Sequence, residues 1–228
     1  MLNTLEKIIE VKNKEVLDLK NKYNINELEK SALNLNTSSN FYKKLYNHSQ
    51  NNYGIIAEVK KASPSKGILR ENFSPVDISK EYEDGGASCL SILTDKNFFK
   101  GDLKYIGLIK DKVDLPILRK DFIIDPIQVF ESKLNGADCI LLIVACLEPN
   151  QMKILYDLSI SLKLDVLIEV HNLQELELCL ELNPYFIGIN NRNLKDMTTN
   201  IDTSIKIAQN VPKDILIVSE SGINSKGD

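Results

Sequence analysis

The sequence has few of the features that mark disulfide-rich, zinc-binding or membrane-spanning proteins. Its four cysteines include no C-x-x-C pair and mostly lie in apolar stretches, which indicates buried, reduced thiols and disfavours a zinc site. No apolar run approaches the ~18 residues that a membrane helix needs. Residues 1–10 also lack the apolar centre of a signal peptide. We therefore expect a cytoplasmic protein without a metal site.

The chain also has no excess of basic over acidic residues. The 228 residues include 28 Lys and Arg against 32 Asp and Glu, a net charge of -4. A general nucleic-acid-binding protein would show a basic stripe, so we expect neither a nucleic acid nor a membrane as a partner. Hydrophobic residues make up 43% of the chain, which allows a sizeable core, and the length suits one large domain.

Short apolar runs alternate with amphipathic stretches from about residue 53 onward. Seven runs are predicted to be strands, at 55–60, 89–93, 116–119, 139–144, 165–170, 186–190 and 215–219. Six stretches between them have helical periodicity, at 75–84, 103–110, 126–134, 149–162, 173–182 and 203–209. This repeat predicts βα units and a parallel sheet. Before it, three helices are predicted at 4–22, 26–33 and 39–46, the first with Thr4 as its N-cap.

Two folds are built from such repeats, a doubly wound open sheet and a closed (β/α)8 TIM barrel. Polar side chains near the C-terminal ends of five strands favour the barrel, where these ends converge on one pocket. These residues are Glu58, Lys60, Lys120, Glu169, Asn190, Arg192 and Glu220. We therefore predict an α/β fold, a single TIM-barrel domain over 1–228. It comprises an N-terminal helical extension (1–50) and βα units 1–7 (51–228).

The chain contains only seven predicted βα units. It ends where the seventh helix is expected to begin, so we expect a barrel truncated after strand 7, with the eighth unit missing. Such a sheet leaves two strand edges unpaired, which invites aggregation or pairing with another chain. A truncated, inactive or weakly active fragment that needs a partner segment is therefore an alternative interpretation. The surviving part of a fusion protein is a further one.

Glu58 and Lys60 are two positions apart on a predicted strand, so their side chains share one face. Charged groups inside a barrel are costly unless they are paired or used. A stabilising ion pair and an active-site pair are equal alternatives on these residues alone. The polar loop 60–67 that follows can present hydroxyl, backbone N–H and ammonium groups to an anion, although by itself it is better explained as an ordinary surface loop.

Seven segments, in order along the chain, resemble the indole-3-glycerol phosphate synthase family. The first is IIAEVKKASPS at 55–65. The others are SILT at 91–94 with FFKG at 98–101, LRKDFI at 118–123, LLI at 141–143, LIEVH at 167–171, GINNRNL at 188–194 and SESGI at 219–223. The predicted N-terminal helices fit the extension that this family carries before its first strand.

The resemblance implies a step of tryptophan biosynthesis. In it, 1-(2-carboxyphenylamino)-1-deoxyribulose 5-phosphate closes a ring, with decarboxylation and dehydration, to give indole-3-glycerol phosphate. No metal or organic cofactor is implied, and the partner is a phosphorylated small molecule. The resemblance implies that Lys120 is the general acid that protonates the carbonyl oxygen, that Lys60 holds the carboxylate and that Glu169 acts in the dehydration. Glu58 is implied as their polar partner.

The resemblance also implies a set of substrate-binding residues. Ser63 is expected near the carboxylate of the substrate, Phe99 and Phe122 against its rings, and Ser221 and Gly222 on its phosphate side. Asn190, Arg192 and Glu220 complete this set. Lys60, Lys120 and Arg192 together offer positive charge to a substrate with two anionic groups.

Several expectations concern single residues or close alternatives. We expect burial to lower the pKa of Lys120 towards neutrality, which would make it a usable acid. His48 and His171 are interpreted as surface or loop residues, and Asp95 and Asp121 as weak candidates to position lysines. A different enzyme on the same architecture, such as a phosphoribosylanthranilate isomerase, suits Glu58, Lys60 and Lys120 less well. A monomer and a homodimer both remain open.

Overall fold

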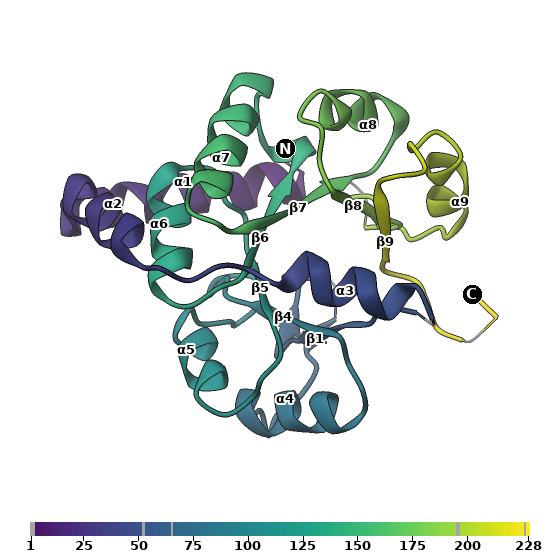
Figure 1. The fold of residues 1–228 in the computed structure, drawn as a ribbon, viewed down its shortest axis with the longest axis horizontal. Coiled ribbons are helices and arrows are strands. Elements are labelled where there is room, and N and C mark those ends of the chain that lie inside the picture. The colour runs from purple at the N-terminus through teal and green to yellow at the C-terminus, as the bar shows by residue number, and fades with distance from the viewer. Residues whose placement is uncertain (1–2, 52, 65, 195–196, 226) are drawn as a thin grey trace.

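A curled parallel sheet forms the centre of the fold, with helices outside it (Figure 1). The computed structural model describes residues 3–51, 53–64, 66–194, 197–225 and 227–228. The sheet has seven strands in the order β1-β4-β5-β6-β7-β8-β9. They are β1 (Ile56–Val59), β4 (Cys89–Leu93), β5 (Ile117–Lys120), β6 (Cys139–Ile143), β7 (Asp165–Val170), β8 (Phe186–Asn190) and β9 (Leu216–Glu220). A small antiparallel hairpin, β2 (Ala62–Ser63) with β3 (Gly67–Ile68), follows β1.

The helices that follow the strands begin where side chains can cap their free N–H groups. Ser74 caps α4, Asp125 caps α6 and Asn172 caps α8, each accepting from a backbone N–H of the first turn. Proline at the start of α4, α6 and α7 needs no such partner. The bounds are α4 (Pro75–Asp84), α5 (Lys104–Lys110), α6 (Pro126–Leu134), α7 (Pro149–Ser161), α8 (Leu173–Leu180) and α9 (Asp202–Ala208), with a 3-10 turn η1 (Val144–Cys146) after β6.

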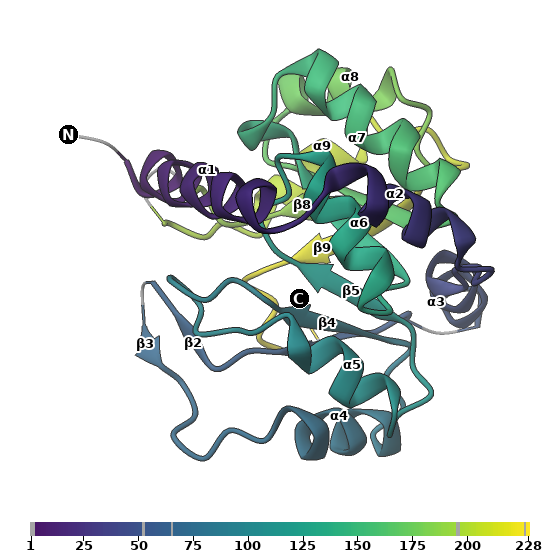
Figure 2. The same cartoon turned by 90° about the vertical axis from the view of Figure 1, so that its left-hand side faces the viewer.

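Three helices precede the sheet, as predicted: α1 (Thr4–Lys22), α2 (Ile25–Asn34) and α3 (Phe41–Ser49). The prediction of Thr4 as the N-cap of α1 is wrong. Asn3 is the cap, because its side chain accepts from Glu6 N while the Glu6 carboxylate accepts from Asn3 N. Figure 2 shows α1 and the β2–β3 hairpin at one end of the sheet and α3 at the other.

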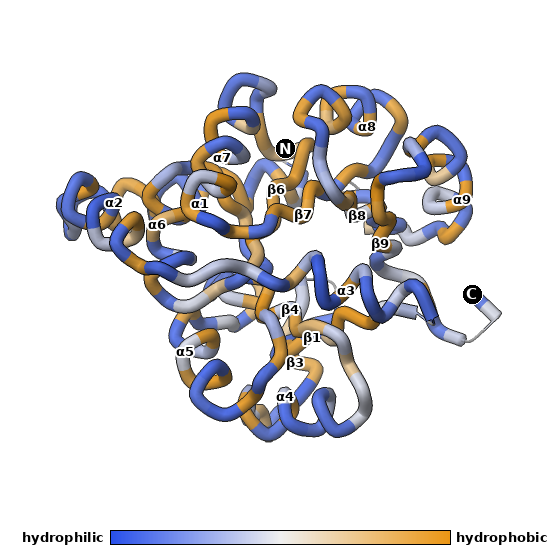
Figure 3. The backbone as a smooth tube through the Cα atoms, viewed as in Figure 1, coloured by the Kyte–Doolittle hydropathy of each residue, from blue (hydrophilic) through white to orange (hydrophobic). Residues whose placement is uncertain are grey.

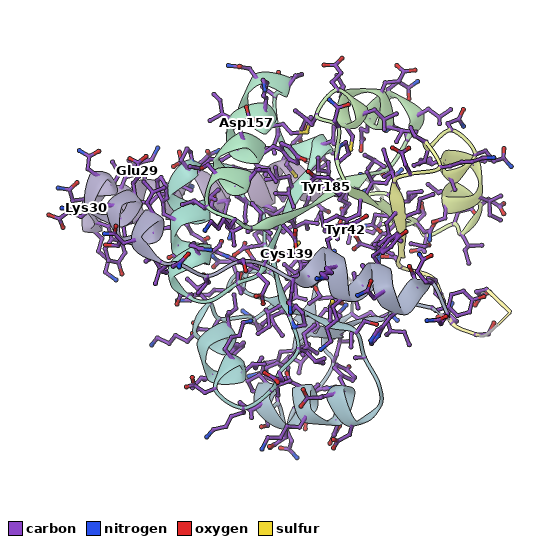
Figure 4. All side chains as sticks on the ribbon, viewed as in Figure 1. Glu29, Lys30, Tyr42, Cys139, Asp157 and Tyr185 are labelled. Carbon is purple, nitrogen blue, oxygen red and sulfur yellow. The ribbon has the colours of Figure 1, made fainter. Side chains whose placement is uncertain are left out.

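The third helix, α3, closes the N-terminal end of the sheet. Phe41 and Leu45 are buried among inward-facing strand residues. Asp165, the first residue of β7, accepts a hydrogen bond from Tyr42 N. The Tyr42 ring packs against Tyr185, with centroids 5.8 Å apart, and the two lie together in Figure 4. The sheet interior is therefore accessible from its opposite, C-terminal end.

Alternate residues of each strand face the inside of the curled sheet, and the others face the helices. In β5, Leu118 packs with the interior cluster, whereas Ile117 packs with α4 and α5. Both sides are apolar, so the strands stand out as hydrophobic segments in Figure 3, as is typical of parallel sheets covered by helices. Near the C-terminal ends several inward positions are polar, among them Glu58, Lys120 and Glu169.

The predicted order of strands and helices is confirmed, with bounds that shift by a few residues. Within the described residues, β1 pairs only with β4, and β9 only with β8. The seven predicted strands form a curled parallel sheet, and the assignment of this sheet to a TIM barrel truncated after strand 7 stays a prediction. The polar loop 60–67 contains the β2–β3 hairpin, which the sequence did not predict. Among the described residues, none of the helices combines the length and apolar character needed to span a membrane.

Replacing Gly101 is expected to destabilise the loop after β4. A Cβ on Gly101 would lie 2.2 Å from the carbonyl oxygen of Leu93, so Gly101→Ala forces backbone to move. We expect it to lower the free energy of unfolding by about 1–3 kcal/mol, measured by urea denaturation. Gly107→Ala in α5 is the control, because a Cβ there meets nothing within 4 Å. It should stabilise by up to about 1 kcal/mol, and equal loss in both variants would contradict the steric argument.

Candidate active site

A cavity of about 1070 Å³ lies inside the curled sheet, reaching from α3 to the C-terminal ends of the strands, with residues of both β1 and β9 in its lining. Eleven of the twelve predicted site residues line it: Glu58, Lys60, Ser63, Phe99, Lys120, Phe122, Glu169, Asn190, Arg192, Glu220 and Ser221. Gly222 is not among the residues that line the cavity. The floor and walls of the cavity are apolar, with inward residues such as Leu118, Leu141 and Leu167. A largely apolar cavity with a few convergent polar groups is the form that small-molecule sites usually take.

Lys120 lies at the centre of the polar groups. Its ammonium nitrogen is 2.5 Å from Glu220 Oε2 and 3.2 Å from Glu169 Oε2. Burial by itself lowers the pKa of Lys120, but Glu220, Glu169 and Glu58 together raise it well above its ordinary value. The expectation of a pKa near neutrality is therefore wrong for the unliganded protein. Lys120 therefore carries its proton in the unliganded site.

Glu169 is fixed on both of its oxygens. Its side chain is only 2% exposed. Oε2 faces Lys120, while Oε1 accepts from Asn190 Nδ2 at 3.1 Å and lies 3.2 Å from His171 Nε2. Burial raises the pKa of Glu169, but the Lys120 ammonium, the His171 ring and the Asn190 hydrogen bond outweigh it and hold the pKa well below its usual range. Glu169 is therefore an ionised carboxylate in a fixed orientation.

Glu220 differs from Glu169 although both contact Lys120. Burial, Glu169 and Glu58 raise the pKa of Glu220 more than the Lys120 ammonium lowers it. Its Oε1 atom is buried and has no hydrogen-bond partner among the described residues. Gly188, opposite on β8, makes room for it, because a Cβ there would lie 2.5 Å from Glu220 Oε1. Two neighbouring carboxylates with opposite pKa shifts can divide acid and base roles.

Glu58 and Lys60 form an ion pair at the mouth of the cavity. About a third of each side chain is exposed, so both remain accessible to a ligand. The β2–β3 hairpin places Ser63 beside them, where its Oγ accepts from Lys66 N. Ser65, which belongs to the motif at 55–65, lies outside the described residues. The two alternatives for Glu58 and Lys60, a stabilising ion pair and an active-site pair, are therefore compatible. The two side chains form the ion pair and also line the cavity.

Asn191 organises the opposite wall, where Ser221 and Gly222 were expected to bind. Its Nδ2 donates to Ser219 Oγ and to the carbonyl of Ser221, and its Oδ1 accepts from Ser204 N. Ser221 has a φ of 66° and Gly222 one of 78°. A left-handed conformation is costly for a serine and persists where neighbours hold it. Asn191 is therefore the residue that fixes this turn.

The aromatic pair Phe99 and Phe122 covers a third side, with ring centroids 6.3 Å apart. The loops that carry the rings are held by carboxylates. Asp95 accepts from Phe99 N, and Asp121 accepts from Phe122 N. Lys12, from helix α1, contacts both carboxylates, at 3.1 Å and 2.9 Å. Asp95 and Asp121 thus do position a lysine, but it is one from the N-terminal extension.

Three residues with a part in this arrangement were not predicted: Lys12, Asn191 and His171. His171 lies in the loop after β7, as one of the two interpretations had it, but it is not a surface residue, because its side chain is 10% exposed and contacts Glu169. Its position two residues after Glu169 was a usable signal, because such residues share a face. No comparable signal exists for Lys12. Among the described residues, no group of three or more His, Cys, Asp or Glu side chains is arranged to hold a metal ion.

Known proteins resemble this chain in sequence and in fold. A profile of the indole-3-glycerol phosphate synthase family matches residues 5–228. The indole-3-glycerol phosphate synthase of Polaromonas naphthalenivorans (strain CJ2) is 46% identical over all of this chain and 87% of its own length. That of Polynucleobacter asymbioticus is 53% identical over 77% of this chain and 66% of its own.

Solved structures agree on the fold alone. A 3-keto-L-gulonate-6-phosphate decarboxylase from Vibrio cholerae superposes with a TM-score of 0.52, covering 73% of this chain and 77% of its own. A structure described as native KDPGal gives 0.51, covering 75% and 73%. Their sequence identities of 13% and 15% carry no information about chemistry.

Proposed function

The chain belongs to the indole-3-glycerol phosphate synthase family, and from this premise we propose that it converts 1-(2-carboxyphenylamino)-1-deoxyribulose 5-phosphate to indole-3-glycerol phosphate. The products besides the indole are carbon dioxide and water. The observation that carries the proposal is the position of Lys120 between Glu169 and Glu220 inside a cavity that also offers Lys60 and Arg192. A carbon–carbon lyase reaction of this kind needs a proton donor first and a proton acceptor later.

The charges of the site match the two anionic groups of the substrate. Lys60 and Ser63 at one side of the cavity are assigned to the carboxylate. Ser221 and Arg192, which also line the cavity, are assigned to the phosphate, and Gly222 forms part of the turn that positions Ser221. A carboxylate near Lys60 competes for its ion pair with Glu58. The rings of Phe99 and Phe122 are assigned to the apolar faces of the substrate, where they exclude water.

The proton transfers follow from the two carboxylates. In the ring closure, the carbonyl oxygen of the substrate takes a proton from Lys120 as the new carbon–carbon bond forms, and carbon dioxide leaves. Glu169 and Glu220 hold Lys120 in its protonated form until then. In the dehydration, Glu169 removes a proton from the ring and returns it to the hydroxyl group, which leaves as water, and Lys120 regains its proton from solvent. Asn190 keeps Glu169 in place throughout.

The direct test is turnover by the purified chain. Incubation with 1-(2-carboxyphenylamino)-1-deoxyribulose 5-phosphate should produce the ultraviolet absorbance of an indole together with one equivalent of carbon dioxide. Circular dichroism should show that the preparation is folded. A folded chain that binds the substrate but forms no indole would overturn the proposal.

Asn191→Ala is expected to weaken substrate binding more than it slows chemistry. The change removes two hydrogen bonds that fix Ser219 and Ser221 and one that holds Ser204 N. With the turn less well ordered, we expect KM to rise about tenfold, about 1.4 kcal/mol, with a smaller change in kcat. Steady-state kinetics measure both. Asn210→Ala is the control, because Asn210 is an exposed position after α9 whose side chain bonds to Lys206 O in its own turn. An unchanged KM in Asn191→Ala would remove the turn from the binding site.

A further inference from the structure

His171 lies between two carboxylates at the end of β7. Its Nδ1 is 2.9 Å from Glu175 Oε2, and its Nε2 is 3.2 Å from Glu169 Oε1. The Nδ1 contact is a hydrogen bond. The Nε2 contact is an ion pair without hydrogen-bond alignment, and Nε2 has no hydrogen-bond partner among the described residues. His171 does not line the cavity, so any effect on the substrate passes through Glu169.

The start of helix α8 holds the imidazole ring. Glu175 Oε2 accepts from His171 N at 2.8 Å as well as contacting the ring. Glu175 Oε1 accepts from Asn172 Nδ2, and Asn172 Oδ1 in turn accepts from Glu175 N. These bonds lock the carboxylate of Glu175 to the first turn of the helix. The ring is therefore tied to a rigid element on the side away from Glu169.

We propose that His171 is a positioning residue, which fixes Glu169 Oε1 so that Oε2 faces Lys120 and the reacting atoms. The inference rests on the proposed function, because the proposed reaction is what gives Glu169 a proton to accept. Asn190 supplies a second contact to the same oxygen, at 3.1 Å. Because Oε1 is held by His171 from the loop after β7 and by Asn190 from β8, the remaining oxygen has one orientation. Small displacements of a catalytic group can cost about 10²-fold in rate.

The contact requires the protonated ring. Burial lowers the pKa of His171, but Glu169 and Glu175 raise it to about 9. The other titratable groups nearby are Lys120 on β5, which contacts the far oxygen of Glu169, and Cys146 from η1, whose thiol is kept neutral by burial. A neutral ring keeps its proton on Nδ1, for the aligned bond to Glu175. Nε2 would then turn a lone pair towards Glu169 and lose the contact.

Kinetics of three variants test the inference. His171→Ala should lower kcat about tenfold at pH 7 and leave KM within about twofold, because the substrate is not touched. His171→Gln should restore most of kcat, since its amide nitrogen reaches as far as Nε2. His171→Asn should not, because its amide reaches only as far as Nδ1. His48→Asn is the matched control, since His48 is exposed and bonds to Ser88 at the opposite end of the sheet.

Two further readouts separate positioning from a merely structural role. Glu175→Gln keeps the acceptor for His171 N but removes the charge that stabilises the imidazolium, so kcat should fall in the same direction as in His171→Ala. In the wild-type chain kcat/KM should decline above pH 9, where the ring loses its proton. His171→Gln should lack that decline. A capping role alone would leave Glu175→Gln at wild-type kcat.

A histidine titration by NMR tests the contact without any activity. The chain has two histidines, so His48→Asn assigns both signals. His171 should titrate near pH 9 in the wild-type chain and at lower pH in Glu169→Gln. An ordinary pKa for His171 in the wild-type chain overturns the inference. So does a wild-type kcat in His171→Ala when Lys120→Ala is inactive in the same assay. In both cases the proposed function stands. Absence of indole formation by the wild-type chain overturns the proposed function, and the titration still decides the contact.

Discussion

Lys120→Ala is expected to abolish nearly all ring closure, a loss of about 10²–10⁴-fold in kcat, which is the usual contribution of a positioned acid. The reason is geometric. Lys120 is the ammonium group that the structure places between Glu169 and Glu220, and it holds its proton inside the cavity. Alanine leaves no donor at that point. Formation of the indole product under saturating substrate measures the loss.

The variant should keep its fold, because the two carboxylates can respond to the lost ammonium. Without Lys120 the pKa of Glu169 rises, and Glu220, whose pKa is already raised, takes up a proton. Protonation of these carboxylates limits the free-energy cost of leaving them buried without the ammonium group. Circular dichroism and thermal unfolding should show the native structure with a lower Tm. Lys104→Ala, an exposed change at the start of α5, should keep full activity.

Lys120→Arg separates charge from proton transfer. Arginine preserves the positive charge between the carboxylates, but its guanidinium does not release a proton in this pH range. We expect Lys120→Arg to be more stable than Lys120→Ala and similarly inactive. Substantial activity in either variant would remove Lys120 from the role of general acid.

The site was predictable where it depends on alternation along a strand. Glu58 with Lys60, and Lys120, Glu169, Asn190 and Glu220 at matching positions of other strands, meet because parallel strands bring their C-terminal ends to one level. The strand pattern therefore predicted that these polar groups converge, whereas Ser63, Phe99, Phe122 and Ser221 were expected only from the family resemblance. The same rule applied to His171 would have placed it beside Glu169.

The pKa of Lys120 was not predictable in this way. Burial alone would have lowered it, but Glu220, 100 positions further along the chain, contacts the ammonium at 2.5 Å. Whether two inward-facing groups touch depends on strand register and rotamers, which the sequence pattern does not specify. The cap of α1 shows the same limit at short range. Thr4 and Asn3 are both good N-caps, and the reciprocal bond to Glu6 decides for Asn3.

Lys12 illustrates contacts that no periodic pattern encodes. It lies on helix α1, among lysines that alternate with acidic residues, a pattern typical of a solvated helix face. Its side chain is nevertheless 3% exposed and contacts Asp95 and Asp121. Asp121 also pairs with Arg119, which in turn contacts Glu131 on α6. One lysine of the extension thus joins a buried network over the ends of β4 and β5.

Lys12→Met is therefore expected to lower the free energy of unfolding by about 3–5 kcal/mol, the usual cost of breaking a buried ion pair by removing one partner. Methionine fills much of the same space, so the loss arises from the charge and not from a cavity. Asp95 and Asp121 are left with one fewer cation. Lys14→Met is the matched control on the same helix, because Lys14 is exposed and its pair with Glu10 is worth only about 0.3–0.5 kcal/mol.

The difference in unfolding free energy between the wild-type chain and Lys12→Met should depend on pH. Burial raises the pKa of Asp121, but Arg119 and Lys12 outweigh it and hold the pKa far below its ordinary value. A carboxylate with a depressed pKa stabilises the fold above its unfolded pKa of about 3.9, and this contribution is lost as the pH falls towards the folded value. Urea denaturation at pH 7 and at lower pH should show the difference narrowing below about pH 4. A difference that stays constant across that range, or a Lys14→Met loss as large as that of Lys12→Met, would mean that the buried network does not hold α1 to the sheet.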